Sequence, residues 1–264
     1  MTYFGVLLRF IGPPLVAMAA LTLWDVRRQK DMPAHFRTWS PWAILFGHVA
    51  LALIYTTPWD NYLVASRVWW YDPALVTGIV LGWVPIEEYT FFVVQTLMVG
   101  LWVLWWMRHL PPPRRPLRAS IPLRLNATLA LGLFWLIGLS MLLSGWGHGR
   151  YMALLLVWAL PPILIQFGFG ADILWHYRKW VLIGLLPSFL YLCLVDGLAI
   201  KSGTWTINPQ NTLGLDLFGI LPLEEIVFFL VTSTLISFGI VLMLARESHI
   251  RARTGKATPE GDPE

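Results

Sequence analysis

Seven long apolar runs constrain the fold of this chain more than any other feature of its sequence. The runs cover, approximately, residues 3–24, 41–57, 86–107, 125–143, 151–171, 180–200 and 223–244. Their lengths are close to the roughly 20 residues that an α-helix needs to cross a bilayer. Charged residues form 13% of the chain, which is about half the share found in soluble domains. We therefore predict an all-α, polytopic membrane bundle of seven transmembrane helices.

The basic residues support this count because they gather on alternate connections between the runs. One side carries Arg27, Arg28, Lys30, Arg37, Arg108, Arg114, Arg115, Arg118, Arg124, Arg178, Lys179, Arg246, Arg251, Arg253 and Lys256. The opposite side carries only Arg67, Arg150 and Lys201. The positive-inside rule then places the N-terminus outside and the C-terminus in the cytoplasm. We expect a multi-pass protein of the cell (inner) membrane.

The segments between the runs differ in character. Residues 108–124 contain Pro111-Pro112-Pro113 and five arginines, which predicts an extended, solvated linker. The polar residues 246–264 predict a disordered tail. Two shorter apolar runs, 74–84 and 213–221, cannot cross a bilayer. We expect them to be interfacial or re-entrant pieces that lead into the third and seventh spans.

The sequence contains an internal repeat. Residues 84–94, Val-Pro-Ile-Glu-Glu-Tyr-Thr-Phe-Phe-Val-Val, return at 221–231 as Leu-Pro-Leu-Glu-Glu-Ile-Val-Phe-Phe-Leu-Val. Further pairs lie upstream: Asp60 with Asp196, Trp69 with Trp205, Pro73 with Pro209, Gly78 with Gly214, Tyr3 with Tyr151, and Pro13-Pro14 with Pro161-Pro162. Spans one to three therefore recur as spans five to seven.

The fourth span explains how the two copies are oriented. Three helices reverse the chain direction, so one further helix is needed before a second copy can run parallel to the first. We predict two parallel three-helix repeats related by a pseudo-two-fold axis near the membrane normal. The expected divisions are 1–107 for the first repeat, 108–150 for the linker and linking span, 151–245 for the second repeat, and 246–264 for the tail.

Four glutamates stand at the first turns of the third and seventh spans: Glu87, Glu88, Glu224 and Glu225. A proline followed by acids is also a favourable helix start, because the proline needs no hydrogen-bond partner there and the acids suit the helix dipole. Ionisable groups within spans, however, mark functional sites by default. Two matching occurrences, each preceded by Asp60 or Asp196, favour a site over a helix cap.

The helical period places an aromatic ring and then a polar group below each acid. The four stripes are Glu87, Phe91 and Gln95; Glu88, Phe92 and Thr96; Glu224, Phe228 and Thr232; and Glu225, Phe229 and Ser233. A lipid-facing surface has no use for this pattern, whereas a cavity for an apolar substrate does. Adjacent buried acids titrate as a coupled set, so one can hold a proton while another is ionised. Acid–base chemistry without a metal needs that arrangement.

The paired motifs resemble the membrane-embedded type of lycopene cyclase domain, in its tandem-domain bacterial and archaeal form. They are Pro85-Ile86-Glu87-Glu88 with Phe91-Phe92, Pro222-Leu223-Glu224-Glu225 with Phe228-Phe229, Asp60-Asn61-Tyr62, Val68-Trp69-Trp70-Tyr71, Asp196-Gly197-Leu198-Ala199-Ile200 and Gly203-Thr204-Trp205. The resemblance extends to about residue 245. It implies redox-neutral cyclisation of the linear ψ end groups of lycopene to β-rings in carotenoid biosynthesis.

The resemblance also implies roles for the acids and the rings. We expect Glu87 and Glu224 to lead as the acid–base pair, supported by Glu88, Glu225, Asp60 and Asp196. For substrate contact we expect Phe91, Phe92, Phe228, Phe229, Trp69, Trp205, Gln95 and Thr232. We expect neither cofactor nor metal: Gly168-Phe169-Gly170-Ala171-Asp172 is only a fragment of a dinucleotide-binding motif and lies inside a span. Expected partners are lycopene, the lipid bilayer and other carotenoid-pathway enzymes, with no nucleic acid.

Other functions fit parts of the same pattern. A proton-coupled transporter or channel also uses repeats and intramembrane acids, but it needs a polar path through the bilayer. A structural assembly protein would use the glutamates only as helix caps, and its acids would not converge. A cyclase or hydratase acting on another carotenoid end group would share the site. Two residues lack repeat counterparts: we expect Arg9 to snorkel or to pair with an outer acid, and His48 to be buried with its hydrogen bonds satisfied.

Overall fold

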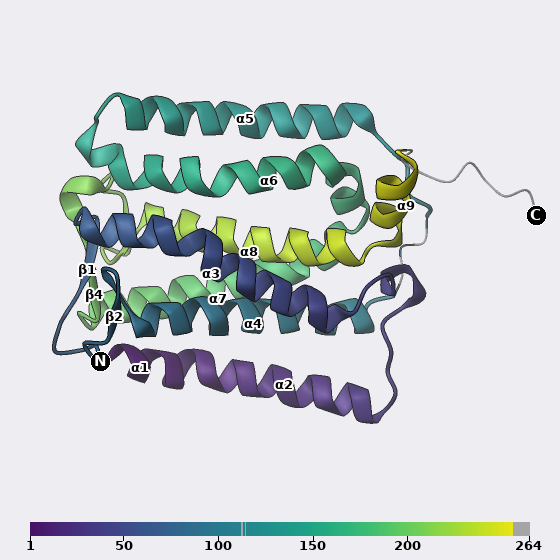
Figure 1. The fold of residues 1–264 in the computed structure, drawn as a ribbon, viewed down its shortest axis with the longest axis horizontal. Helices are drawn as coiled ribbons and strands as arrows, with labels where there is room; N and C mark the ends of the chain where they lie inside the picture. Colours follow the sequence, from purple (N-terminus) through teal and green to yellow (C-terminus); the bar gives the residue numbers. More distant parts are fainter. Residues whose placement is uncertain (112, 114, 256–264) are drawn as a thin grey trace, which may run out of the picture.

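The computed structural model describes residues 1–111, 113 and 115–255 as an elongated helical bundle (Figure 1). The described part contains seven helical stretches long and apolar enough to cross a membrane, which confirms the predicted count. The first combines α1 (Tyr3–Val6), a π-helical turn (Leu7–Ile11) and α2 (Gly12–Arg27). The others are α3 (Pro41–Ala65), α4 (Ile86–His109), α5 (Ile121–Leu143), α6 (Arg150–His176), α7 (Arg178–Lys201) and α8 (Leu223–Leu244).

The observed spans agree with the apolar runs, with one useful difference. Helix α3 runs to Ala65 rather than to residue 57, so Asp60 lies inside the helix and not at its end. The predicted linker is non-helical from Leu110 to Ser120 where it is described. Pro112 and Arg114, on which part of that prediction rested, lie outside the described residues.

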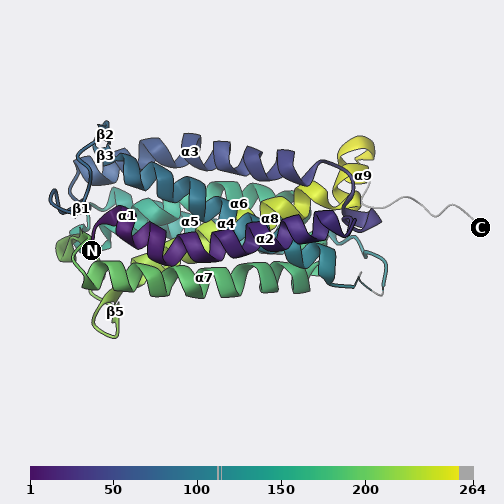
Figure 2. The same cartoon turned by 90° about the horizontal axis from the view of Figure 1, so that it is seen from below.

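Helices α4 and α8 form the centre of the bundle. They pack against each other; α2, α3 and α7 also pack on α4, while α3, α6 and α7 also pack on α8 (Figures 1 and 2). Helix α5 packs on α6 at one edge and exposes apolar side chains such as Leu129 and Leu133. Because α4 and α8 are enclosed on most sides, the polar residues near their starts are buried.

Paired prolines leave two backbone carbonyls of α6 without helical hydrogen-bond partners, and side chains of neighbouring helices supply the missing donors. Pro161-Pro162 cannot donate to the carbonyls of Val157 and Trp158. Trp135 Nε1 donates to Val157 O at 3.4 Å, and the Tyr55 hydroxyl donates to Trp158 O at 2.8 Å. Backbone groups inside a bilayer must find such partners within the protein.

The first span has a similar repair. The Tyr191 hydroxyl of α7 donates to the carbonyl of Phe10 at 2.6 Å, four residues before Pro14. The π-helical turn ends immediately before Gly12 and Pro13. In both places a tyrosine of a neighbouring helix, α3 or α7, donates to a carbonyl that a proline leaves without a helical partner.

Short strands cover the end of the bundle that carries the N-terminus, which we call the hairpin end. Strands β1 (Trp69–Tyr71) and β4 (Trp205–Ile207) pair antiparallel, with Trp70 opposite Thr206. Two hairpins, β2–β3 (Val80–Leu81, Val84–Pro85) and β5–β6 (Asp216–Leu217, Leu221–Pro222), lead directly into α4 and α8. Single 3₁₀ turns lie at Gly147–Gly149 and Pro209–Asn211. A third, Ala34–Phe36, lies in the connection between α2 and α3.

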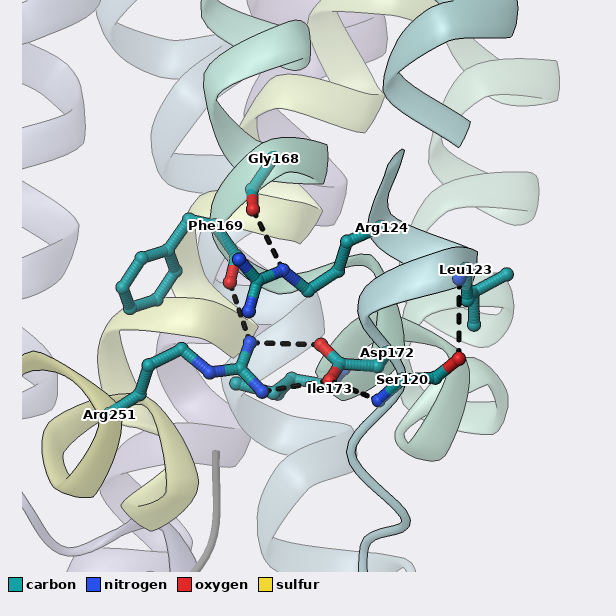
Figure 3. A network of polar contacts seen from close by, with 8 residues as sticks. All are labelled: Ser120, Leu123, Arg124, Gly168, Phe169, Asp172, Ile173 and Arg251. Carbon is teal, nitrogen blue, oxygen red and sulfur yellow. Dashed lines mark hydrogen bonds and ion pairs between the residues drawn. The ribbon is translucent and has the colours of Figure 1, made fainter. Parts of the chain in front are cut away.

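The predicted disordered tail is wrong for its first half. Residues Arg246–Thr254 form helix α9, which packs beside α8 and α6 at the opposite end of the bundle (Figure 1). Arg251 is buried and binds Asp172 through two bonds of 2.9 and 2.8 Å (Figure 3). A paired arginine orders a segment whose composition alone suggests disorder. Residues 256–264 lie outside the described part.

The Gly168-Phe169-Gly170 segment has a structural explanation at this α9 end. Gly170 has non-helical backbone angles inside α6, which leaves nearby carbonyls free. Arg124 Nε donates to Gly168 O at 2.9 Å and Arg251 donates to Phe169 O at 2.6 Å (Figure 3). This polar network ties α5, α6 and α9 together.

Candidate active site

A small chamber lies at the hairpin end, between the first turns of α4 and α8 and the helices around them. Its volume is about 50 Å³, room for only a few water molecules. Its walls hold four acids, ten aromatic side chains and six aliphatic ones. The lining residues are Tyr3, Val6, Leu7, Ile11, Trp59, Asp60, Trp69, Tyr71, Glu88, Phe91, Phe92, Tyr151, Leu192, Val195, Asp196, Trp205, Ile207, Glu225, Phe228 and Phe229.

The four acids come from four different helices. Glu88 and Glu225 are supplied by α4 and α8, and Asp60 and Asp196 by α3 and α7. All four side chains are buried. The predicted convergence of carboxyl groups from both halves of the chain is therefore present in this chamber.

Glu87 and Glu224, the expected leading pair, do not line this chamber. Glu87 Oε1 accepts a hydrogen bond from the Thr77 backbone at 2.6 Å, and Glu224 Oε1 accepts one from the Leu213 backbone at 2.7 Å. Adjacent helical residues point about 100° apart, so only one glutamate of each pair can face inward. Glu88 and Glu225 are therefore the glutamates that face the chamber.

Tyrosines hold both inward glutamates. The Tyr3 and Tyr71 hydroxyls donate to the same oxygen of Glu88, at 2.6 and 2.9 Å. The Tyr151 hydroxyl donates to Glu225 at 2.7 Å. Sequence reasoning assigned no role to these tyrosines, although Tyr3 and Tyr151 are repeat counterparts and that pairing was the available signal.

Tyr71 lies in β1, outside the membrane-spanning helices. Burial, together with the negative charge of the neighbouring Glu88 carboxylate, raises the pKa of the Tyr71 phenol well above its ordinary value. The phenol therefore keeps its proton across the physiological range and remains a hydrogen-bond donor to Glu88.

The two aspartates differ in their partners. Trp205 Nε1 donates to Asp196 at 3.0 Å. Its repeat counterpart Trp69 donates instead to the Tyr71 hydroxyl, at 3.2 Å. Both carboxyl oxygens of Asp60 are buried and have no hydrogen-bond partner among the described residues.

Aromatic rings enclose the acids, as expected for Phe91, Phe92, Phe228, Phe229, Trp69 and Trp205. Tyr3 packs on Trp205 with ring centroids 4.8 Å apart, and Tyr151 packs on Trp69 at 5.3 Å. Trp59, which sequence reasoning missed, also lines the chamber and lies 6.0 Å from the Phe228 ring.

Gln95 and Thr232 lie one turn deeper than the phenylalanines and outside this chamber. The Gln95 amide donates to the Thr232 hydroxyl at 3.3 Å, and both line a second cavity. Arg9 is exposed and donates to Met1 Sδ at 3.4 Å. Among the described residues it is not paired with an outer acid, and snorkelling stays a prediction. His48 Nδ1 lies 2.8 Å from the Ile44 carbonyl, but the side chain is half-buried and not buried as predicted.

The fold and the chamber define an integral membrane protein with a buried site of acids and aromatic rings. The chain belongs to the lycopene cyclase family, whose model matches residues 14–106 and 148–244.

Curated relatives agree with this family. A lycopene beta-cyclase from Halobacterium salinarum is 37% identical over 235 residues, covering 88% of this chain and 91% of the relative. A bifunctional lycopene cyclase/phytoene synthase from Podospora anserina is 35% identical, covering 74% of this chain and 34% of the relative. One from Colletotrichum graminicola is 38% identical, over 73% and 34%. No solved structure matches.

Proposed function

We propose that this chain is a lycopene β-cyclase, a carotenoid cyclase that closes the linear ψ end groups of lycopene into β-rings. One observation carries the proposal: four acids and a ring of aromatic faces converge in one small, largely apolar chamber. The lycopene beta-cyclase of Halobacterium salinarum, similar over most of both chains, supports the same activity. The reaction is an isomerisation, so the enzyme is an intramolecular lyase that needs a proton donor and a proton acceptor.

The chemistry follows from the chamber. A carboxylic acid protonates the terminal double bond of the substrate and leaves a tertiary carbocation. A second double bond of the chain attacks this cation and closes a six-membered ring, which moves the positive charge to a ring carbon. A carboxylate then removes a proton from the neighbouring carbon, and the electron pair forms the ring double bond. One proton enters and one leaves, so atoms and charge balance.

Hydrogen bonding assigns the base. Bonds donated to a carboxylate favour its ionised form. Glu88 accepts two phenol bonds, whereas Glu225 accepts one. Glu88 is therefore the group best prepared to remain ionised and to take the proton from the ring carbon.

The absence of donors assigns the acid. A buried carboxyl group without a hydrogen-bond partner is costly as an anion and much less costly when protonated. Asp60 is in this position among the described residues, and it lines the same chamber as Glu88. Asp60 is the proton donor in this scheme, with Asp196 and Glu225 completing the set of acids.

Aromatic faces stabilise the cation between these two steps. A cation over a tryptophan or phenylalanine face gains about 2 kcal/mol or more when both are desolvated. Trp59 and Trp69 lie with ring centroids 5.7 Å apart, and Phe91 lies 6.3 Å from Phe229. Because the chamber is small, these rings must separate when an end group enters.

The two halves of the chain are arranged as parallel repeats in this proposal. Residues 1–107 and 151–245 form the copies, 108–150 joins them, and the two stretches matched by the family model support this division. The β1–β4 ladder pairs repeat counterparts around Trp70 and Thr206, as a two-fold axis requires. The crossed ring pairs of Tyr3 with Trp205 and of Tyr151 with Trp69 support the same axis.

The positive-inside rule supplies the orientation. The hairpin end faces outside and α9 lies on the cytoplasmic side of the cell membrane. Lycopene enters from the bilayer. Other carotenoid-pathway enzymes are its natural partners, and the bifunctional fungal relatives are consistent with this because their names join a cyclase to a phytoene synthase.

A lycopene-accumulating host tests the proposal. The wild-type gene should convert lycopene to carotenoids with β-rings, detected by chromatography. Glu88→Gln and Asp60→Asn should each lower conversion at least 100-fold. Asp216→Asn, which changes an exposed acid at the same end, should leave it unchanged. Full activity of both chamber variants would refute the acid–base scheme, and absence of any cyclised product from the wild type would refute the function.

A further inference from the structure

The chamber continues into two deeper cavities along helix α8. Phe92 and Phe228 line both the chamber and the second cavity, whose volume is about 240 Å³. His48, Leu51 and Gln166 line both the second cavity and a third, of about 820 Å³. The three cavities therefore adjoin in series from the hairpin end toward α9. We call the second and third cavities together the α3–α6 groove.

One stripe of α8 forms the floor of this groove. Its members follow the helical period: Phe228, Thr232, Leu235, Ile236, Gly239, Leu242 and Met243. From Glu225 to Met243 the helix rises about 27 Å, close to the roughly 30 Å thickness of a bilayer hydrocarbon core. A long linear molecule with its end at Glu225 can therefore lie along the stripe.

Helices α3 and α6 form the walls. Toward the hairpin end they are joined, because Tyr55 and Trp158 exchange hydrogen bonds and Trp59 Nε1 donates to Leu154 O at 3.2 Å. Toward α9 the two ribbons diverge, with α8 between them (Figure 1). Leu51 and Ile165 line the groove there and are exposed, so the groove opens sideways to lipid.

The groove wall is predominantly apolar. The Thr232 hydroxyl donates to the Phe228 carbonyl at 2.8 Å, and the Gln166 amide nitrogen donates to the Leu235 carbonyl at 3.0 Å. These donors are engaged within the protein and not offered to a ligand. Because these donors are engaged and most of the lining is apolar, the groove suits a hydrocarbon chain.

The repeat counterpart of the third cavity carries three tryptophans on its floor helix. The positions of Gly239, Leu242 and Met243 on α8 correspond to Trp102, Trp105 and Trp106 on α4, at the offset of 137. Trp102 Nε1 donates to Ile183 O of α7 at 2.8 Å. Trp102 therefore bridges α4 and α7, whereas its counterpart Gly239 has no side chain and lies against His48 of α3.

In the α3–α6 groove a glycine stands at the position that matches Ile183. This residue is Gly47 of α3, and a side chain added there would meet no atom within 4 Å. The counterpart side does contain a cavity, lined by residues that include Pro14, Met18 and Trp102, but that cavity shares no lining residue with the chamber.

We propose that the α3–α6 groove holds the linear polyene tail of the substrate while its end group occupies the chamber. We propose that the counterpart groove, which carries the tryptophans and shares no lining residue with the chamber, does not. This inference rests on the proposed cyclase function. It assigns Gly47 and Ala52 as the positions that admit the tail. The chamber is pseudo-symmetric, but the substrate tail reaches it from the bilayer on one side only.

Filling the groove tests this inference. Gly47→Trp and Ala52→Trp place a large ring in the third and second cavities, respectively. Two controls carry a new tryptophan elsewhere: Met18→Trp in the counterpart cavity, and Gly132→Trp on α5, where an added side chain also meets nothing within 4 Å. The amount of each folded variant is measured by size-exclusion chromatography in detergent.

The assay uses two substrates with the same ψ end group: lycopene, and an acyclic apocarotenoid that keeps one ψ end and a shortened polyene. We expect Gly47→Trp and Ala52→Trp to lower the ratio of kcat/KM for lycopene over the short substrate at least tenfold. Both controls should keep the wild-type ratio.

The outcomes separate the two hypotheses. A wild-type protein that cyclises neither substrate refutes the proposed function. A wild-type protein that cyclises both, together with groove variants that keep its ratio, refutes the tail path alone. Equal loss of both substrates in folded groove variants also overturns the tail path, because the groove would then serve the chamber itself.

Discussion

Removing the Tyr71 hydroxyl tests the assignment of Glu88 as the base. Tyr71→Phe keeps the ring and deletes one of the two bonds to Glu88 Oε2, the longer one at 2.9 Å. Because the raised pKa of Tyr71 keeps the phenol protonated, the wild-type donor is present at every working pH. A hydrogen bond to a charged group contributes about 1.5–3 kcal/mol. The ionised form of Glu88 loses about that much stabilisation in the variant.

The sign of the effect follows directly. A base whose ionised form is destabilised takes up a proton at higher pH, so it is inactive over a wider acidic range. The acid limb of the kcat/KM profile should move to higher pH by about 1 to 2 units, since one unit corresponds to about 1.4 kcal/mol. The profile is measured with purified enzyme and lycopene in liposomes buffered on both sides.

Tyr177→Phe is the control for this experiment. Tyr177 also donates to a glutamate, Glu247, at 3.0 Å, but it lies at the α9 end. This variant should keep the wild-type profile. If Tyr71→Phe moves the alkaline limb and leaves the acid limb in place, Glu88 is the proton donor and the assignment given above is wrong.

Three further predictions concern stability. Arg251→Met leaves the buried Asp172 without its ion pair and should lower the free energy of unfolding by about 3–5 kcal/mol, measured by thermal unfolding in detergent. Glu87→Ala removes the acceptor of the Thr77 backbone donor and should cost about 1–3 kcal/mol, with kcat per folded molecule within about threefold of wild type. Tyr55→Phe leaves the Trp158 carbonyl without its donor and should also cost about 1–3 kcal/mol.

Each of these has its own control. Arg253→Met changes an exposed arginine on the same helix and should leave stability unchanged; equal stability of the two arginine variants would contradict a role for the ion pair. A 100-fold fall in kcat for Glu87→Ala would return this glutamate to the catalytic set. Tyr62→Phe changes an exposed tyrosine of the same helix and is the control for Tyr55→Phe. Equal melting temperatures of the two variants would show that the bond from Tyr55 to the Trp158 carbonyl does not stabilise the fold.

Much of the fold could be predicted because it depends on local composition and periodicity. Apolar run lengths gave the seven spans, and the repeated Pro-x-Glu-Glu motifs located the two central helix starts. These features depend on each segment's own need to satisfy its backbone in lipid. The ordered helix at 246–254 escaped prediction because its order depends on Asp172, which is distant in sequence.

The sequence by itself determined that acids from both copies would meet at one end of a membrane bundle, with aromatic rings one helical turn deeper. Only the tertiary structure decided that Glu88 and Glu225, and not their neighbours, face the chamber, because rotation about a helix axis is set by packing. It also decided that Tyr71, opposite Trp205 in the β1–β4 ladder, gives Glu88 a second donor. Hydrogen bonds between residues far apart in the chain break the symmetry that the repeat creates, and a linear pattern carries no record of them.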